Sequence, residues 1–391
     1  MLRVITGGES HGPALVAIVD GAPSGLQITS DDIDVDLSRR QAGYGRGGRM
    51  QIERDRIRIL SGIRNGVTLG SPVTLLVENL DYENWKTVMS ADTGIDPEIE
   101  TRPRPGHGDL AGMLKYGTDD ARNILERASA RETAARVAAG AIARRILGSL
   151  GITVRSRVTA VGTVSSPAEE SASESVFILA EDSLMRCTDT RVCEMMSNEI
   201  DSAKADGDSL GGVFEIAAFG CMPGLGSHTQ SDRRLDGLLC SAVMAIPAIK
   251  GVEVGSGFVL AARRGSQTHD EIFYEADRGL YRKTNHAGGI EAGMSNGESI
   301  LIRAYMKPIP SLARPLRTVD LRDMSGVEAF KERADVCAVP AAAVVGEAVV
   351  AIVLAGAAQE KFGGDSISEM VRNMEGYLKQ IAGLWKRDER A

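Results

Sequence analysis

Cysteine is rare in this sequence, which has five cysteines among 391 residues, and no two of them form a CxxC pair. An odd number of cysteines without such pairs is typical of reduced, mostly buried thiols. The first ten residues contain no apolar run of the kind that forms a secretory signal. We therefore expect a cytoplasmic protein.

Apolar runs that could cross a membrane are also missing. The longest apolar stretch, 336–358, contains Pro340 and a central Glu347. A charge at the middle of a bilayer would be costly, so we interpret this stretch as a buried helix. No Gly-Lys-Ser/Thr sequence occurs, which argues against a P-loop. The five histidines show no metal-ligand spacing, and we expect no metal site.

Lysine is scarce relative to arginine, because the 45 basic residues comprise 10 Lys and 35 Arg. Arginine is preferred where planar, bidentate contacts bind phosphate or carboxylate groups. Codon usage in a GC-rich genome predicts the same excess, and the totals do not decide between the two explanations. The net charge of −8 argues against binding to nucleic acid or to an anionic membrane.

The remaining composition is that of a globular protein, with 43% hydrophobic and 25% charged residues. A prior of about 150 residues per domain predicts two or three domains. A helix is expected from the capping residues at 29–32 to about Gln41. Short apolar runs predict strands at 2–6, 15–19, 57–60, 73–78, 152–163, 213–219 and 299–306. These elements alternate without a regular βαβ rhythm, which favours a mixed α+β fold.

Two long Ala-rich helices are predicted at roughly 120–149 and 337–356. Their small side chains would let neighbouring backbones approach closely, so we expect them to form a buried helical layer. A further helix at 366–385 has apolar residues at helical spacing. Polar stretches at 164–175 and 198–209 are predicted to be surface loops.

Residues 8–12 match G-x-S-x-G, the nucleophile elbow of α/β-hydrolases. That elbow needs a helix directly after the serine. Here Pro13 and a strand-like run follow Ser10, so the match is weak. A serine hydrolase using Ser10 is kept as an alternative.

A Gly/Arg segment at 43–49 matches G-x-G-x-x-G, yet it follows a helix and opens none, which a dinucleotide-binding turn must do. Across 39–64 there are eight arginines against Glu53 and Asp55, a local charge of +6. A solvated basic loop is the plain interpretation. In an acidic protein we favour an anion-binding patch, and a non-catalytic protein that binds phosphorylated ligands is the second alternative.

Two histidines in tight loops beside arginines are candidate general acids, because their ordinary pKa is near neutrality. His11 lies in the turn at 8–12, and His107 lies in a Pro/Gly loop at 102–109. Arg127 and Arg131 are four residues apart and would share a helix face. Further stiff or charged segments occur at 307–311 and 333–335.

Taken together, these segments resemble the chorismate synthase family, and the resemblance extends from Gly7 to about Glu347. The motifs that carry it stand in the family's order at 8–12, 39–50, 104–109, 126–133, 285–297, 307–311 and 333–343. Any one of them would be weak, but seven in order are specific.

The resemblance implies a fold and a reaction. The family fold is a single large β-α-β sandwich with a helical layer between antiparallel sheets, usually assembled as a homotetramer. It implies one domain over 1–391 in place of two or three. The family removes phosphate from 5-enolpyruvylshikimate 3-phosphate by an anti 1,4-elimination that gives chorismate, the last step of the shikimate pathway. This carbon–oxygen lyase reaction requires reduced FMN with no net redox change.

The family's functional residues map onto this chain one by one. The resemblance implies that His107 protonates the leaving phosphate oxygen, that His11 protonates or holds the reduced flavin, and that Asp335 relays the flavin N5 proton. The implied anion-binding positions for substrate or NADP are Arg40, Arg46, Arg49 and Arg131. The implied flavin contacts are Arg127, Ala128, Ser129, Pro247, Ala248, Ala292, Lys307, Pro308, Ile309, Pro310, Ser311 and Arg333.

Four positions depart from the residues that relatives can carry there. Pro247 replaces Asn, Ala292 replaces Gly, Ala128 replaces Ser, and Ala334 replaces Ser or His. Ala334 removes a hydrogen bond next to Asp335, whereas the other changes are mild where the contacts are made by the backbone. Because the chain has no credible dinucleotide motif, we expect an external flavin reductase, with NADPH at most an indirect reductant.

Overall fold

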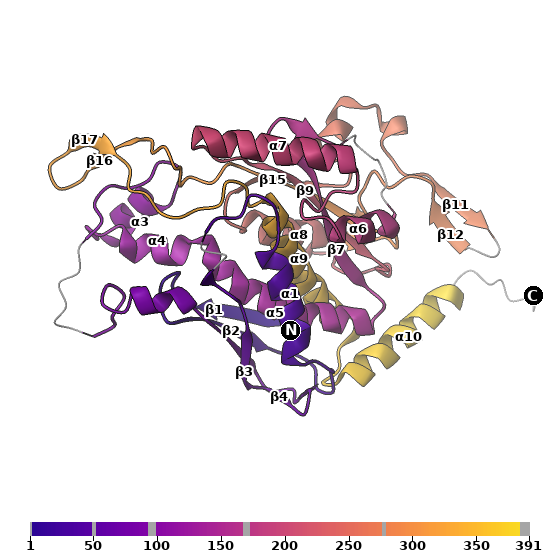
Figure 1. Cartoon of the computed structure of the whole chain (residues 1–391). Coiled ribbons are helices and arrows are strands. Elements are labelled where there is room, and N and C mark those ends of the chain that lie inside the picture. Colours follow the sequence, from indigo (N-terminus) through magenta and orange to yellow (C-terminus); the bar gives the residue numbers. More distant parts are fainter. Residues whose placement is uncertain (1, 49–51, 93–98, 167–172, 276–278, 384–391) are drawn as a thin grey trace, which may run out of the picture.

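Two antiparallel sheets enclose a layer of helices in the computed structural model, which describes residues 2–48, 52–92, 99–166, 173–275 and 279–383 (Figure 1). The N-terminal sheet has the order β1–β2–β6–β3. Its strands are β1 (Arg3–Gly7), β2 (Ala14–Asp20), β6 (Val73–Glu78) and β3 (Ile57–Ser61). Alternate residues of β2, namely Leu15, Ala17 and Val19, are buried, as expected for a sheet covered on one face.

The second sheet has the order β10–β15–β9–β7–β8. Its strands are β10 (Ile249–Val254), β15 (Ile300–Met306), β9 (Gly212–Phe219), β7 (Thr153–Val161) and β8 (Val164–Ser165). Within the described ranges, four two-stranded pairs lie outside the two main sheets. They are β4 (Ile63–Arg64) with β5 (Val67–Thr68), β11 (Ile272–Glu275) with β12 (Gly279–Arg282), β13 (Ile290–Glu291) with β14 (Met294–Ser295), and β16 (Arg317–Asp320) with β17 (Ser325–Glu328).

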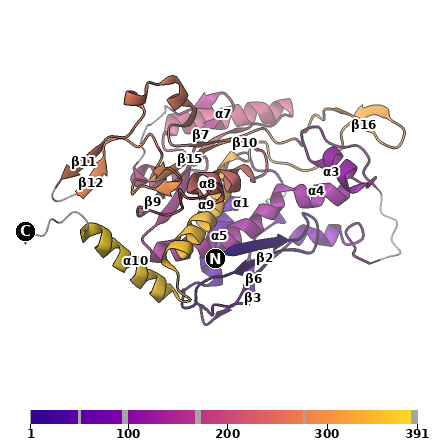
Figure 2. The same ribbon diagram turned by 180° about the vertical axis from the view of Figure 1, so that it is seen from behind.

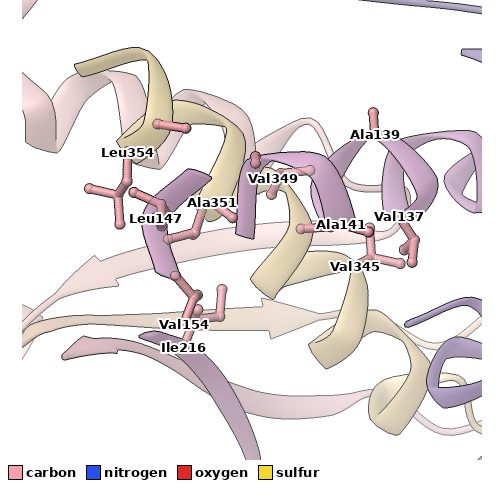
Figure 3. Close-up of a cluster of buried hydrophobic side chains, with 14 of the residues drawn as sticks. Val137, Ala139, Ala141, Leu147, Val154, Ile216, Val345, Val349, Ala351 and Leu354 are labelled. Carbon is pink, nitrogen blue, oxygen red and sulfur yellow. The ribbon is translucent and has the colours of Figure 1, made fainter. Parts of the chain in front are cut away.

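The helical layer contains α1 (Ser30–Gln41), α5 (Thr133–Ser149), α8 (Leu235–Met244) and α9 (Val339–Phe362), and Figures 1 and 2 show α5 and α9 at its centre. A Cβ atom on Gly140 would lie 2.4 Å from Cβ of Ala348, so the two backbones touch where α5 crosses α9. Figure 3 shows the core at this crossing, where side chains of both helices lie beside Val154 and Ile216 of the second sheet.

Helix α9 is long and apolar enough to span a membrane, but 83% of its most apolar window is buried inside the protein. The prediction of a buried helix at this stretch is therefore confirmed. Glu347 in its middle is fully buried and accepts hydrogen bonds from Arg39 at 2.8 Å, Arg186 at 2.9 Å and Ser156 at 2.7 Å. This buried cluster ties α9 to α1 and β7.

The remaining helices lie outside the central layer. They are α3 (Asp109–Tyr116), α4 (Arg122–Ala128), α6 (Glu174–Glu181), α7 (Thr190–Asp206) and α10 (Ile367–Gly383). Short 3₁₀ turns occur at Leu80–Asn84, Ala130–Glu132, Ser231–Arg233, Gly257–Ala262 and Gly265–Gln267. The C-terminal helix predicted at 366–385 is present as α10 over Ile367–Gly383, and residues 384 and 385 lie outside the described residues.

Two predictions of secondary structure are wrong. The single helix expected at 120–149 is interrupted at Ser129, whose extended backbone (φ −64°, ψ 143°) separates α4 from the 3₁₀ turn that leads into α5. The loop expected at 198–209 is helical as far as Asp206, because Met196, Ile200 and Ala203 form a buried face of α7. Of the loop expected at 164–175, residues 167–172 lie outside the described residues, and its two ends belong to β8 and α6.

Candidate active site

The main cavity has a volume of about 600 Å³ and lies where β10 and β15 of the second sheet meet the helical layer. This volume is in the range of roughly 300–1,000 Å³ that is usual for small-molecule sites. Seven cationic and two carboxylate side chains of the described residues line it: Arg40, Arg46, Arg104, Arg131, Lys250, Lys307 and Arg333, with Glu332 and Asp335. Cationic side chains therefore outnumber carboxylates in the described wall of the cavity, although the whole chain is acidic.

Arg40 and Arg131 are held together by one buried carboxylate, that of Asp55. Asp55 accepts from Arg131 Nη1 at 2.6 Å and from Arg40 Nη1 at 3.4 Å. Arg40 also donates to Thr133 Oγ1 at 2.9 Å. Burial, with Arg131 and Arg46 nearby, lowers the pKa of Arg40 to about 10 although Asp55 opposes the shift. Arg40 therefore remains charged at neutral pH, and a bound anion would relieve its repulsion with Arg131 and Arg46.

Arg46 and Asp335 form a clamp across the cavity wall. Arg46 Nη1 donates to Asp335 Oδ2 at 2.5 Å, and the backbone N–H of Gly47 donates to Asp335 Oδ1 at 2.6 Å. A Cβ atom on Gly47 would lie 2.5 Å from the carbonyl oxygen of Ala334, so only glycine fits this approach. Arg49, the other anion-binding position expected in this segment, lies outside the described residues.

His107 lines the cavity, and its ring contacts the buried carboxylate of Asp109, the first residue of α3. Its Nδ1 lies 2.5 Å from Oδ1 of Asp109 and 3.1 Å from Nη2 of Arg104, so a ligand would meet the ring through Nε2. Burial opposes ionisation of Asp109, but His107 and Arg104 outweigh it and lower the pKa of Asp109 to about 2. Arg104 donates to Asp109 Oδ2 at 2.9 Å and to Ser311 Oγ at 2.8 Å. The imidazole is therefore oriented by an ionised carboxylate.

The other side of the cavity is apolar and built from small residues. Pro247, Ala248, Ile309, Pro310, Ala128, Ala338, Ala341, Ala342 and Val345 line it, together with Ser129 and Ser311. Lys307 lies at its edge and donates to the carbonyl of Gly106 at 2.7 Å. Apolar lining residues together with clustered cations fit a flavin mononucleotide, which has an aromatic ring system and a phosphate.

His11 lies in a second cavity of about 320 Å³ that shares Ser129, Glu332 and Arg333 with the main one. Its Nδ1 lies 2.9 Å from Oε1 of Glu126, and its ring stacks on Trp85 with centroids 4.1 Å apart. Burial opposes ionisation of Glu126, but His11 and Arg122 lower its pKa. Glu126 therefore stays ionised and fixes the ring.

Three of the residues expected to contact flavin line neither cavity. Arg127 turns away and donates to the carbonyls of Gly8 and Thr6 at 3.1 Å each. Pro308 is absent from both walls, although its neighbours on either side line the main cavity. Ala292 lies in the β13–β14 turn with a φ of 49°. Ser10 is followed by β2, not by the helix that a nucleophile elbow requires.

Several residues that shape the site were not singled out from the sequence. Asp109 and Glu126 orient the two histidines, and Asp55 bridges two of the arginines. Trp85 stacks on one histidine. Asp109 stands two residues after His107, so its spacing was a usable signal. Trp85 and Asp55 come from distant segments, and only the folded chain brings them to the site.

Comparison with known proteins gives one consistent result. The sequence profile of the family described as chorismate synthase matches residues 2–358. The chorismate synthase of Desulforudis audaxviator is 56% identical over 385 residues, covering 97% of this chain and 98% of that protein. That of Symbiobacterium thermophilum is 54% identical, covering 97% and 100%. A crystal structure of chorismate synthase superposes with a TM-score of 0.80 at 41% identity, covering 98% and 99%.

Proposed function

Because the chain belongs to the chorismate synthase family, which converts 5-enolpyruvylshikimate 3-phosphate to chorismate with reduced FMN, we propose that this elimination takes place in the main cavity. The observation that carries the proposal is the concentration of seven cationic side chains around one cavity that also contains His107. The substrate has a phosphate and two carboxylates, and guanidinium groups pair with such anions in a bidentate manner.

The arginines bind and orient the substrate. Arg40 and Arg131 are fixed by Asp55, and Arg46 is fixed by Asp335, so their positions are set before an anion arrives. Preorganised cations of this kind stabilise charge that develops during a reaction without further rearrangement. Arg49 belongs to the same proposed set on the strength of the family motif.

His107 serves the leaving group. Loss of phosphate builds negative charge on an oxygen, and an imidazolium can protonate or stabilise it through Nε2. The ionised carboxylate of Asp109 at 2.5 Å supports the charged ring during this step. The wall of small and apolar residues behind the site excludes water.

The same wall would hold the flavin, with Ala128, Ser129, Pro247, Ala248, Ile309, Pro310 and Ser311 along the ring system and Lys307 and Arg333 as cationic partners. Pro308, Arg127 and Ala292 stay in the proposed set on the strength of the family motifs. When bound, reduced FMN supplies transient electron density to the elimination. His11 would hold a proton next to the bound flavin, and the carboxylate of Asp335 would relay the proton that the substrate loses from C6. Both oxygens of Asp335 accept from Arg46 and Gly47 and keep a further lone pair for this role.

The setting of the enzyme is part of the proposal. We infer a single domain that assembles as a homotetramer in the cytoplasm, as the family usually does. The Gly/Arg segment follows the helix α1, whereas a dinucleotide-binding turn follows a strand. An external flavin reductase, with NADPH as an indirect reductant, is therefore proposed as the source of electrons. No part for nucleic acid, membrane or metal is proposed.

An anaerobic assay with the enolpyruvyl substrate and chemically reduced FMN tests this function. Chorismate should appear by its absorbance, with one phosphate released per chorismate. A protein that binds the substrate and reduced FMN but forms no chorismate would be the non-catalytic binder. Labelling of Ser10 by a fluorophosphonate probe would instead support the serine hydrolase, and no labelling is expected.

A further inference from the structure

The side chain of Asn79 contacts both an arginine of the main cavity and the loop that carries His11. It directly follows β6 and is buried, with 5% of its surface exposed. Its Oδ1 accepts from Arg131 Nε at 2.9 Å. Its Nδ2 donates to the carbonyl of Gly12 at 2.7 Å and to that of Glu9 at 3.1 Å. One amide therefore connects an arginine of the main cavity to the loop that carries His11.

The loop with His11 is held from two opposite sides. On one side, Glu126 accepts from the backbone N–H of His11 at 2.8 Å and contacts its ring. On the other side, Asn79 binds the carbonyls of Glu9 and Gly12, which flank the histidine in the chain. Glu126 fixes the direction of the ring, and Asn79 fixes the depth at which the loop lies against the cavity wall.

We propose that Asn79 is a positioning residue for the elimination, which sets the place of His11 relative to the anion bound by Arg131. The inference rests on the proposed roles of His11 and Arg131. Only an amide can accept from a guanidinium at one end and donate twice to carbonyls at the other. The isosteric carboxylate of an aspartate would keep the contact with Arg131 and lose both contacts with the loop.

The Asn79→Asp variant separates the two functions of the side chain. Its KM for the enolpyruvyl substrate and its Kd for reduced FMN should stay within about threefold of wild type, because Arg131 keeps its acceptor. Its kcat should fall about 10- to 100-fold, since small displacements of a catalytic group cost rates of this order. Asn373→Asp is the matched control, because Asn373 also donates to a buried backbone carbonyl, at 2.8 Å, but lies on α10. Its kinetics should not change.

A double-mutant cycle with His11→Ala tests whether Asn79 acts through the histidine. The double variant should turn over at the rate of His11→Ala alone. An Asn79→Ala variant, which also removes the acceptor for Arg131, should show the same loss of kcat together with a raised KM. If Asn79→Asp does not fold, Asn79→Ala still tests whether the side chain of Asn79 is needed for turnover.

Tryptophan fluorescence gives a measurement that does not depend on turnover. The sequence has two tryptophans, Trp85 and Trp385. In a Trp385→Phe background, the emission of Trp85 reports its stacking on His11. Asn79→Asp should move this emission towards that of His11→Ala, and Asn373→Asp should leave it unchanged.

Two results would refute the role proposed for Asn79, and a third would refute the role proposed for His11. Rate losses that multiply in the double variant would show that Asn79 acts independently of His11. Wild-type kcat in Asn79→Asp, with a slow His11→Ala, would show that the loop needs no such anchor. Wild-type turnover in His11→Ala would instead refute the role that the proposed function gives to His11.

Discussion

Replacing Glu347 by Gln should destabilise the protein without touching the main cavity. Glu347 is fully buried in the middle of α9, and three arginines surround its carboxylate: Arg39, Arg186 and Arg144. Two further acids, Glu181 and Asp36, share these arginines. The cluster is thus neutral, with three positive and three negative charges. The substitution keeps the shape of the side chain and leaves one buried positive charge uncompensated.

The magnitude follows from this charge count. Removing one partner of a buried ion pair costs about 3–5 kcal/mol. In Glu347→Gln the two remaining acids still pair with the arginines, and the glutamine still accepts from Ser156. We therefore expect the free energy of unfolding to fall by an amount at the lower end of this range, about 3 kcal/mol. Unfolding in urea, followed by circular dichroism, measures this loss. Glu360→Gln on the same helix is the matched control, because its pair with Arg233 is exposed and such pairs contribute less than about 1 kcal/mol.

The pH dependence gives a second check on the same cluster. Burial opposes ionisation of Glu347, but Arg39, Arg186 and Arg144 outweigh it, so its pKa in the folded protein lies below the ordinary 4.5. Stability from this group is therefore present above about pH 4.5 and is lost as the pH falls through the lower folded value. The difference in free energy of unfolding between wild type and Glu347→Gln should be largest at neutral pH and should become smaller in acid. A loss below about 1 kcal/mol at pH 7 would refute the reasoning.

The cavity leads to three more expectations. His107→Ala should lower kcat about 100- to 10,000-fold while FMN affinity is kept, and a normal rate of phosphate release in stopped flow would contradict this. Asp335→Asn should slow cleavage of the C6–H bond in a single turnover, whereas full activity would remove Asp335 from the mechanism. Gly47→Ala should raise KM for the substrate, because its Cβ would lie 2.5 Å from the Ala334 carbonyl and displace the clamp on Arg46. An unchanged KM would show that the clamp does not position Arg46.

The strands were predictable because their signals are local. The apolar runs at 57–60 and 73–78 became β3 and β6 with bounds that differ by at most one residue. The break at Ser129 was missed although it has a local signal, since Ser129 is a capping residue whose hydroxyl accepts from the N–H of Arg131 at 3.3 Å. Sequence alone did not show where the side chain of Arg131 goes. Its guanidinium is held by Asn79 and Asp55, which lie far away in the sequence.

The arginine clusters also show that sequence alone does not determine where a side chain points. Arg39 and Arg40 are neighbours in one motif, yet Arg40 lines the cavity and Arg39 turns to Glu347. Adjacent residues on a helix point in directions about 100° apart, so a motif alone does not say which one meets the ligand. Arg102 likewise pairs with Glu100, whereas Arg104 reaches the cavity. Part of the arginine excess therefore serves buried acids and not the bound anion.

The position of α9 near the end of the chain affects how the protein is made. Strands β7 and β9 are complete by Phe219, but the helix that covers them ends at Phe362. At about 5–20 residues per second, roughly 7–30 seconds separate the two events during translation. Throughout this interval α9 does not cover Val154 and Ile216. The ion pairs of Glu347 with Arg39, Arg144 and Arg186 have also not formed. The nascent chain therefore exposes apolar strand surface for that time, which is when aggregation threatens it most.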